Sequence, residues 1–413
     1  MLLEPLDLAV FIGYCLLIIG MGLFVSEEKK GHVKNSSDYF LASKALPWWA
    51  VGASLIASNI SAEQFIGMSG SGFALGLAIS TYEWMAAATL LVVAIFFLPV
   101  YIKKGIYTMP GFLLDRYDTR VRTTMAIFWL LLYVFVNLTS VLYLGALSLN
   151  TILNVPLVYG IIGLALFAMI YSIYGGLKAV AWTDVVQVVF LIVGGLATTY
   201  IALQMVGGGD AWEGIGLLRK EVPGHFSMIL SKGEMMIPDG QGGTRDAYLD
   251  LPGISVLVGG MWITNLSYWG FNQYITQRAL AAKSLDEAQK GMIFAGFLKL
   301  LMPLIVVIPG IAALVIVNNG LDATFIESMK DPGTGLIKSD RAYPTLLQLL
   351  PVGLKGLAFA ALTAAIVSSL ASMANSTSTI FTMDIYKKYF GQNASESKQV
   401  SVGRITAGVA FFI

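Results

Sequence analysis

The sequence predicts an all-α membrane protein that crosses the bilayer many times. Hydrophobic residues make up 56% of the 413 residues, charged residues make up 12%, and the mean hydropathy is +0.74. A water-soluble core of this length does not have such a composition. The apolar runs are long enough to cross roughly 30 Å of hydrocarbon as helices. Two of them carry a polar cluster in their middle, which predicts helices that break inside the membrane.

The apolar runs predict ten membrane spans. Their expected bounds are 6–26, 47–72, 77–102, 121–150, 155–174, 177–205, 252–280, 287–318, 342–386 and a last one that begins near 400. The first run lacks a small-residue cleavage site, so we expect a retained anchor and not a signal peptide. The last run stops inside an apolar segment, and we expect further C-terminal helices that are missing from this chain.

The loop charges predict the orientation of these spans. Lysines and arginines follow the first, third and ninth spans: Lys29, Lys30, Lys34, Lys44, Lys103, Lys104, Arg116, Arg120, Arg122, Lys387, Lys388, Lys398 and Arg404. By the positive-inside rule these loops are cytoplasmic. The amino terminus and the loops near 206–250 and 319–341 are then outside the cell, and the expected location is the inner cell membrane. A short amphipathic helix is expected from Trp212 to Arg219.

Composition argues against several other functions. The net charge of +1 gives no sign of nucleic-acid binding, and the single Cys15 supports neither a disulfide nor a metal site. No obligate protein partner is expected. The lipid bilayer is the expected surrounding.

The second span is organised around SNISAEQF, residues 58–65. Four polar residues occupy its middle: Asn59, Ser61, Glu63 and Gln64. At mid-depth an unpaired polar group costs several kcal/mol, so a lipid-facing helix does not carry them. Because two Ser-Gly pairs follow, we expect a helix that breaks near the midplane and turns backbone carbonyls toward a cavity. A buried, unbroken helix is the alternative.

The seventh span repeats this pattern five spans later. MWITNLSYWGFNQ, residues 261–273, places Asn265, Ser267, Tyr268 and Asn272 between apolar flanks. Two interrupted helices at this separation indicate inverted repeats with a binding site at their interface. The expected division of a single transmembrane domain, 1–413, is an extra helix over 6–26, a first repeat over 47–205 and an incomplete second repeat over 252–413.

Two ionisable residues lie inside predicted spans and are candidate functional residues. Glu83 lies in the third span, and Lys299 lies in the eighth. The alternatives are a structural pairing for Glu83 and snorkelling to the cytoplasmic surface for Lys299. Together with Asn59, Gln64 and Asn265 they supply donors and acceptors with little net charge, which suits a neutral, hydroxyl-rich solute such as a sugar.

Large side chains flank this polar cluster. Met68, Tyr82, Tyr268 and Trp269 are candidate lids, since aromatic faces stack on sugar rings, and ordinary packing is the alternative. An amino-acid substrate would instead need a helix amino terminus for its carboxylate and a partner for its ammonium group.

The ninth span reads AAIVSSLASMANSTSTIF from Ala364. Small residues at this spacing usually indicate close helix packing. They also offer the neutral oxygens that a dehydrated sodium ion needs, since hard cations prefer oxygen ligands. We expect unwound carbonyls at Ala57 and Ile60 to meet Ser369 there.

These motifs resemble those of a known family. SNISAEQFIGMSGSG, VNLTSVLYLG, WTDVVQV, YWGFNQY and AAIVSSLASMANSTSTIFTMDIYKKY are similar to the solute:sodium symporters, and within them to the bacterial sodium/galactose symporters of the sodium/glucose cotransporter type. The resemblance covers nearly the whole chain. It implies a leucine-transporter-type fold of five plus five helices with one extra N-terminal helix. It also implies sodium-coupled sugar symport by alternating access. Because symport makes and breaks no covalent bond, we expect no enzyme activity.

The resemblance further implies roles for individual residues. The sugar site would be Gln64, Glu83, Asn265 and Lys299 supported by Asn59, with Met68 and Tyr82 outside it and Tyr268 as the inner gate. The sodium ligands would be the carbonyls of Ala57, Ile60 and Ala365 and the hydroxyls of Ser368 and Ser369. Asp184, an acid in the sixth span, matches a position implicated in coupling. By the resemblance, the galactose symporters have a serine where this chain has Ala86, so one hydrogen bond to the sugar would be lost.

Ala371 predicts the coupling ratio. By the resemblance, relatives that carry two sodium ions have a hydroxyl residue at this position, and a methyl group does not ligate a cation. We therefore expect one sodium ion per sugar. The rival functions are same-fold symport of an inositol, sialic acid or an amino acid, and, from another class, a non-transporting sugar sensor or a sodium leak channel.

Overall fold

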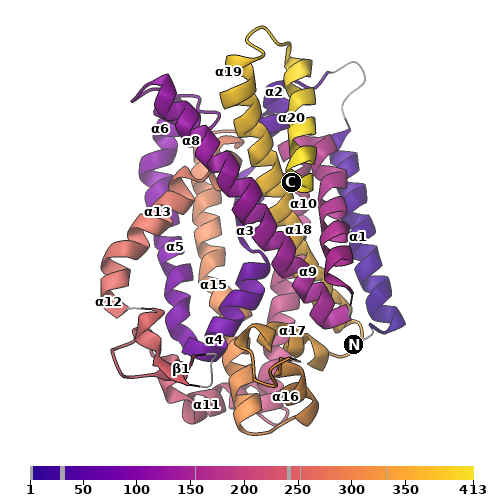
Figure 1. Ribbon diagram of the computed structural model, residues 1–413, viewed down its shortest axis with the longest axis vertical. Helices are drawn as coiled ribbons and strands as arrows, with labels where there is room; N and C mark the ends of the chain where they lie inside the picture. The colour runs from indigo at the N-terminus through magenta and orange to yellow at the C-terminus, as the bar shows by residue number, and fades with distance from the viewer. Residues whose placement is uncertain (1–2, 28–32, 154, 240–242, 252, 332) are drawn as a thin grey trace.

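The computed structural model is an elongated bundle of helices (Figure 1). It describes residues 3–27, 33–153, 155–239, 243–251, 253–331 and 333–413. Lys29, Lys30 and Pro252, which the sequence places in a cytoplasmic loop and at the start of the seventh span, lie outside these residues. The described helical stretches that are long and apolar enough to cross a membrane are Pro5–Ser26, Glu63–Lys103, Thr119–Asn150, Ser172–Val206, Ala247–Phe271, Leu285–Asn318 and Leu354–Tyr389. The prediction of a polytopic helical membrane protein is confirmed.

The helices follow the predicted spans closely. In the first half they are α1 (Pro5–Ser26), α2 (Ser36–Leu41), α3 (Trp48–Asn59), α4 (Ser69–Leu75), α5 (Thr81–Val92), α6 (Leu98–Lys103), α7 (Met109–Leu113), α8 (Thr119–Leu131), α9 (Thr139–Leu153) and α10 (Leu157–Val206). Three π-helical turns extend these helices. Turn η2 (Glu63–Met68) leads directly into α4, η4 (Val93–Phe97) joins α5 to α6, and η5 (Leu132–Leu138) joins α8 to α9.

The second half contains a small hairpin as well as helices. The helices are α11 (Ala211–Glu221), α12 (Gly253–Ser255), α13 (Met261–Phe271), α14 (Gln273–Leu280), α15 (Leu285–Asn318), α16 (Ala323–Met329), α17 (Ala342–Leu346), α18 (Leu354–Ile380), α19 (Lys387–Tyr389) and α20 (Glu396–Phe412). Strands β1 (Met236–Pro238) and β2 (Thr244–Asp246) pair antiparallel, with Ile237 opposite Arg245. Helix α11 confirms the amphipathic helix expected from Trp212 to Arg219.

The first predicted break lies directly after α3. Helix α3 ends at Asn59, and Ile60 is extended, with φ −77° and ψ 114°, before the helix resumes at η2. The two Ser-Gly pairs lie beyond the break, inside α4, where they allow close packing on α15. A Cβ atom on Gly72 would lie 2.6 Å from the carbonyl oxygen of Val307. The polar stretch therefore breaks the helix, and the glycines beyond the break allow α4 to pack closely on α15.

The second predicted break separates α13 from α14. Asn272 between them is extended, with φ −79° and ψ 123°. The Tyr133 hydroxyl donates to the Asn272 side chain at 2.5 Å and accepts from the Gln273 backbone N–H at 3.0 Å. These bonds satisfy polar groups that a broken helix exposes inside the bundle.

Two span boundaries depend on backbone geometry. The predicted gap between 174 and 177 falls on Gly176 of α10, whose φ is +64° and whose added Cβ would lie 2.4 Å from the Tyr39 carbonyl oxygen. The predicted start of the ninth span at 342 is wrong, because α18 begins only at Leu354. Pro351 keeps Leu350 extended, and Gly353 has φ +90°, so the helix of α17 does not continue into α18.

The two ends of the bundle carry different loops. Figure 1 shows α2 and α19 at the upper end and α11 and α16 at the lower end. The basic loops and the loops near 206–250 and 319–341 therefore lie at opposite ends, in the arrangement that the charge pattern requires.

Candidate functional site

A cavity of about 250 Å³ lies between the first broken helix, α5, α13 and α15. Its wall contains all nine residues predicted for the polar cluster and its lids: Asn59, Gln64, Met68, Tyr82, Glu83, Asn265, Tyr268, Trp269 and Lys299. Ile79 and Ala86 complete the wall. Residues 240 positions apart in the sequence thus share one polar pocket, at the depth where α3 and α13 are interrupted. Ala86 places a methyl group on this wall, at the position where the resemblance leads us to expect a hydroxyl.

A buried ion pair forms the polar centre of this cavity. Lys299 Nζ donates to Glu83 Oε2 at 2.6 Å, and Gln64 Nε2 donates to the other carboxylate oxygen at 2.9 Å. The Lys299 and Glu83 side chains are 1% and 4% exposed, so Lys299 does not snorkel. Its ammonium also lies 5.4 Å from the centre of the Trp269 ring. Because the two charges compensate each other, the cavity offers many hydrogen bonds and no net charge.

Tyr268 stands between this cavity and a larger one of about 630 Å³. Asn59, Gln64 and Tyr268 line both cavities, so they form the partition between them. Asn59 Nδ2 donates to the Tyr268 hydroxyl at 2.7 Å, and that hydroxyl also bonds to the Tyr274 hydroxyl. Trp269 packs edge-on against Tyr268, with ring centres 5.2 Å apart. Tyr268 therefore lies in the wall that the two cavities share.

The larger cavity reaches the predicted sodium ligands at Ser369 of α18. The Ser369 hydroxyl lies 3.0 Å from the carbonyl oxygen of Ser58 and 3.2 Å from that of Ile60. Ser58 and Ile60 belong to the break after α3, where carbonyls lose their helical partners. The structure therefore brings Ser369 and Ile60 together, and it places Ser58 rather than Ala57 in contact with the serine.

The other predicted sodium residues lie next to this contact. Ala365 lies on α18 one turn before Ser369, and both residues are fully buried. The Ser368 hydroxyl points to Asp184 of α10 and donates to its Oδ1 atom at 2.6 Å. Ser368 thus links the proposed coupling acid, Asp184, to the helix that carries Ser369.

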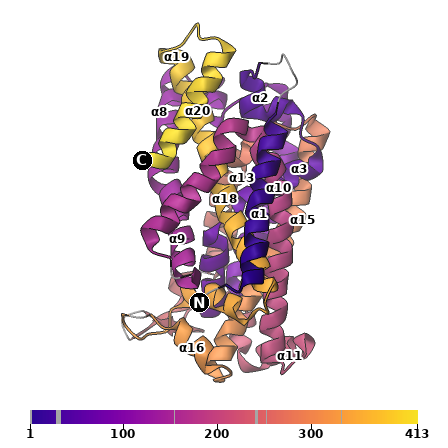
Figure 2. The ribbon, with the colours of Figure 1, turned by 90° about the vertical axis from the view of Figure 1, so that its right-hand side faces the viewer.

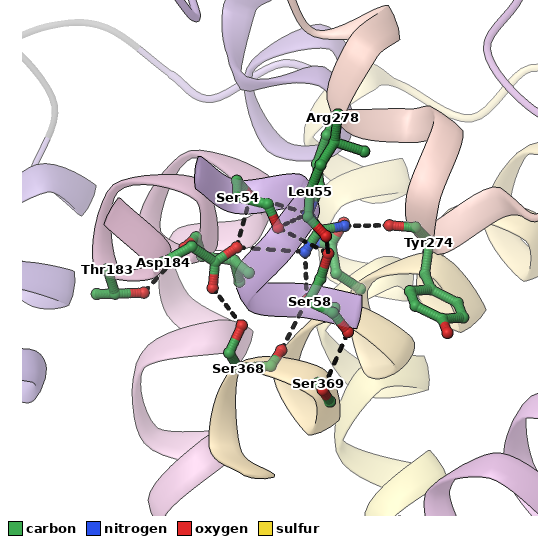
Figure 3. Close-up of polar contacts among 12 residues, drawn as sticks. Ser54, Leu55, Ser58, Thr183, Asp184, Tyr274, Arg278, Ser368 and Ser369 are labelled. Carbon is green, nitrogen blue, oxygen red and sulfur yellow. Dashed lines mark hydrogen bonds and ion pairs between the residues drawn. The ribbon is translucent and has the colours of Figure 1, made fainter. Parts of the chain in front are cut away.

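Asp184 belongs to a buried charged cluster (Figure 3). Its Oδ2 atom accepts from the Ser54 hydroxyl at 2.5 Å and lies 3.4 Å from Arg278 Nη2. Arg278 Nε donates to the Ser54 carbonyl at 3.1 Å, and the guanidinium also bonds to Ser372. Asp184 and Arg278 are both fully buried. The cluster ties α3, α10, α14 and α18 together directly beside the Ser369 contact.

Arg278 is the functional candidate that sequence reasoning missed. It lies near the end of the seventh predicted span, where an arginine is usually explained as a loop or snorkelling charge. The available signal was Asp184, because an acid buried in a membrane span needs a cationic partner. That partner had to come from another helix, and Arg278 follows the second break by six positions.

The comparisons with known proteins define the class of protein. Residues 39–413 match the sodium:solute symporter family, and the chain belongs to this family. The family resemblance seen in the sequence is confirmed. The chain is a multi-pass membrane protein of a transporter family.

Two named relatives and one solved structure are similar to this chain. A sodium/glucose cotransporter of Vibrio parahaemolyticus is 58% identical over 416 residues, which cover 100% of this chain and 74% of that protein. A sodium/myo-inositol cotransporter 2 of Sus scrofa is 37% identical over 412 residues, which cover 98% of this chain and 59% of that protein. A Na⁺-coupled sialic acid symporter, solved in a substrate-bound outward-open state, matches with a TM-score of 0.84 at 24% identity and covers 99% of this chain and 80% of that one. The leucine-transporter-type fold is thereby confirmed.

Proposed function

We propose that this chain carries out sodium-coupled symport of a neutral sugar, a galactose- or glucose-like hexose, by alternating access. The observation that carries the proposal is the 250 Å³ cavity, in which the Glu83–Lys299 pair and the amides of Asn59, Gln64 and Asn265 face one small space. Sugar hydroxyls both donate and accept hydrogen bonds, and this wall offers both kinds of partner. The volume lies just below the usual range of ligand pockets, about 300–1,000 Å³, which suits a small solute such as a monosaccharide.

The charge balance of the cavity favours a neutral solute. Lys299 is the cation on the wall, and its ammonium is already 2.6 Å from Glu83 Oε2. A sialic acid or amino-acid carboxylate would compete with Glu83 for that ammonium inside a buried site, where an unpaired charge is costly. A hexose and an inositol are both neutral polyols, and the named relatives include transporters for each. The missing hydroxyl at Ala86 bears on this choice, because it removes one partner for a sugar hydroxyl.

Sodium is the proposed second substrate. Its ligands are the Ser369 and Ser368 hydroxyls with the carbonyls of the broken helix and of Ala365. One sodium ion per sugar is supported by two features. Ala371 is fully buried and offers a methyl group, and Arg278 already places a positive charge 3.4 Å from Asp184. A second cation beside Asp184 would lie next to a buried guanidinium, which repels it.

The transport cycle is proposed to use the two repeats, 47–205 and 252–413. Each repeat contributes a broken helix to the partition at Tyr268, so rocking of one against the other opens the sugar cavity to one side at a time. The amino terminus is proposed to lie outside the cell and the basic loops in the cytoplasm of the inner cell membrane.

Uptake into proteoliposomes tests the proposal. Purified protein is reconstituted, and uptake of radiolabelled galactose, glucose, myo-inositol and sialic acid is measured under an inward sodium gradient and under a matched choline gradient. We expect sodium-dependent uptake of a hexose, which the unlabelled hexose inhibits more strongly than myo-inositol or sialic acid does. Preferred uptake of myo-inositol or sialic acid would assign a different substrate. Sugar binding without uptake, or sodium flux without sugar, would indicate a sensor or a leak channel.

A further inference from the structure

Helix α1 precedes the predicted repeats and contacts both helices that carry the buried Asp184–Ser368 bond. Figure 2 shows α1 running along the bundle beside α10 and α18. Phe11 of α1 packs on Phe359 of α18, with ring centres 4.7 Å apart. One turn further along, Tyr14 packs on Phe190 of α10 at 5.0 Å. Helix α1 therefore braces α10 against α18.

Asp7 of α1 caps the amino terminus of α18. Its Oδ1 atom accepts from the backbone N–H groups of Gly353 at 2.7 Å and Gly356 at 2.8 Å, and the side chain is fully buried. The first N–H groups of a helix lack partners within the helix, and a carboxylate there also interacts favourably with the helix dipole. Gly353, the N-cap residue of α18, has no side chain to supply this cap. The cap therefore comes from a helix 346 positions away in the sequence.

Gly356 fixes how closely the two helices approach. A Cβ atom at this position would lie 2.4 Å from the Asp7 carbonyl oxygen, so the two backbones are in direct contact. Helix α18 is regular from Leu354 to Ile380, and Ser369 follows Gly356 by thirteen positions. At about 1.5 Å per residue this is roughly 20 Å along one rigid rod. The contact with α1 thus sets the height and rotation at which α18 presents Ser369 to the broken helix.

We propose that Asp7 is a positioning residue for sodium binding, acting through α18. The inference rests on the proposed function, because it takes Ser369 as a sodium ligand. Without the cap, the first turns of α18 fray or shift, and a smaller fraction of molecules holds Ser369 in register with the carbonyl of Ile60. The apparent sodium affinity falls in proportion to that fraction. Saturating sodium restores the competent state, since the ion binds that state preferentially.

The test compares Asp7→Ala with Asp210→Ala. Asp210 caps α11 by accepting from the Trp212 and Glu213 N–H groups at 2.8 and 3.4 Å, far from α18 in the sequence and outside the sodium contact. The readouts are the half-saturating sodium concentration for uptake, the maximal rate at saturating sodium, and the thermal stabilisation of purified protein by sodium. We expect Asp7→Ala to raise the half-saturating concentration at least threefold with the maximal rate within twofold of wild type. Asp210→Ala leaves the sodium dependence unchanged.

A second pair of variants approaches the same contact from α18. Gly356→Ala forces α18 away from α1 and is expected to raise the half-saturating sodium concentration as Asp7→Ala does. Gly216→Ala in α11 is its control, because nothing lies within 4 Å of the added Cβ atom. Asp7→Asn keeps one acceptor oxygen and loses the charge, so its effect lies between wild type and Asp7→Ala.

The proposal is overturned if Asp7→Ala and Gly356→Ala shift the sodium dependence no more than their controls do. It is also overturned if both lower the maximal rate at unchanged half-saturating sodium, which is the result of a purely structural cap. Failure of wild-type protein to take up sugar with sodium refutes the proposed function instead. In that case the thermal stabilisation by sodium is compared between the wild-type protein and Asp7→Ala, and a smaller stabilisation of the variant at the same sodium concentration still supports the role of Asp7.

Discussion

Variants of the Glu83–Lys299 pair should affect protein stability and sugar binding differently. In Glu83→Gln the Lys299 ammonium, 1% exposed, keeps no counter-charge among its described contacts. Removing one partner of a buried pair typically costs about 3–5 kcal/mol of folding free energy. Lys299→Met removes the buried counter-charge of the Glu83 carboxylate in the same way. In the double variant Glu83→Gln/Lys299→Met no charge is left unpaired, and replacement of a whole buried pair is often neutral.

Thermal unfolding in detergent and sugar binding at saturating sodium are measured on all three variants. Both single variants should be clearly destabilised, and the double variant should recover most of the lost stability. Sugar affinity should stay low in all three, since one lost buried partner costs about 1–3 kcal/mol, or roughly 5- to 150-fold. Asp286→Asn breaks the exposed Asp286–Lys290 pair on the same helix and serves as the control, because exposed pairs contribute little. A double variant that binds sugar like wild type would show that the pair is structural and that the site is misplaced.

Three further predictions follow from single contacts. Asn265→Ala should lower sugar affinity roughly 5- to 150-fold with little loss of stability, because the described bond of the Asn265 amide is to the Met261 carbonyl within its own helix turn. Unchanged sugar affinity would remove Asn265 from the site. Ser369→Ala, which removes the hydroxyl 3.2 Å from the Ile60 carbonyl, should raise half-saturating sodium without changing sugar selectivity, as measured by uptake competition. Burial lowers the pKa of His225, whose ring bonds to the Phe73 carbonyl, below its usual value of 6.5. The unfolded chain therefore binds the proton more readily than the folded protein does, and the stability of the fold should decrease as the pH drops through 6.5. His225→Gln, which does not titrate, should flatten that part of the pH–stability curve.

The sequence predicted the features that depend on polarity within apolar runs. Asn59 and Gln64 at mid-depth indicated a broken helix, and the break after Asn59 is confirmed. Glu83 and Lys299 stand out because ionisable groups inside membrane spans are costly, and the structure pairs them at 2.6 Å. These inferences succeeded because burying a polar group has the same cost whatever the fold, so one sequence is enough to flag it.

The features that were missed depend on which helices meet. Arg278 gives no sign in the sequence that it reaches Asp184, 94 positions away. The start of α18 was placed too early because Gly353 and Pro351 act through backbone geometry inside an otherwise apolar run. The cap from Asp7 is equally invisible, since a helix cap is normally sought within the same segment. Such contacts are set by the packing of distant elements, which hydropathy does not report.

Coupling of sugar movement to sodium is the central claim, and a null-point measurement in proteoliposomes tests it most directly. With the membrane potential held at zero, a tenfold inward sodium gradient is opposed by outward sugar gradients of increasing size, and net sugar flux is recorded. One sodium ion per sugar predicts zero net flux at about a tenfold sugar gradient, because each tenfold ratio corresponds to about 1.4 kcal/mol. A null point at about a hundredfold would contradict the single ion. A null point that stays at equal sugar concentrations, whatever the sodium gradient, would contradict symport itself.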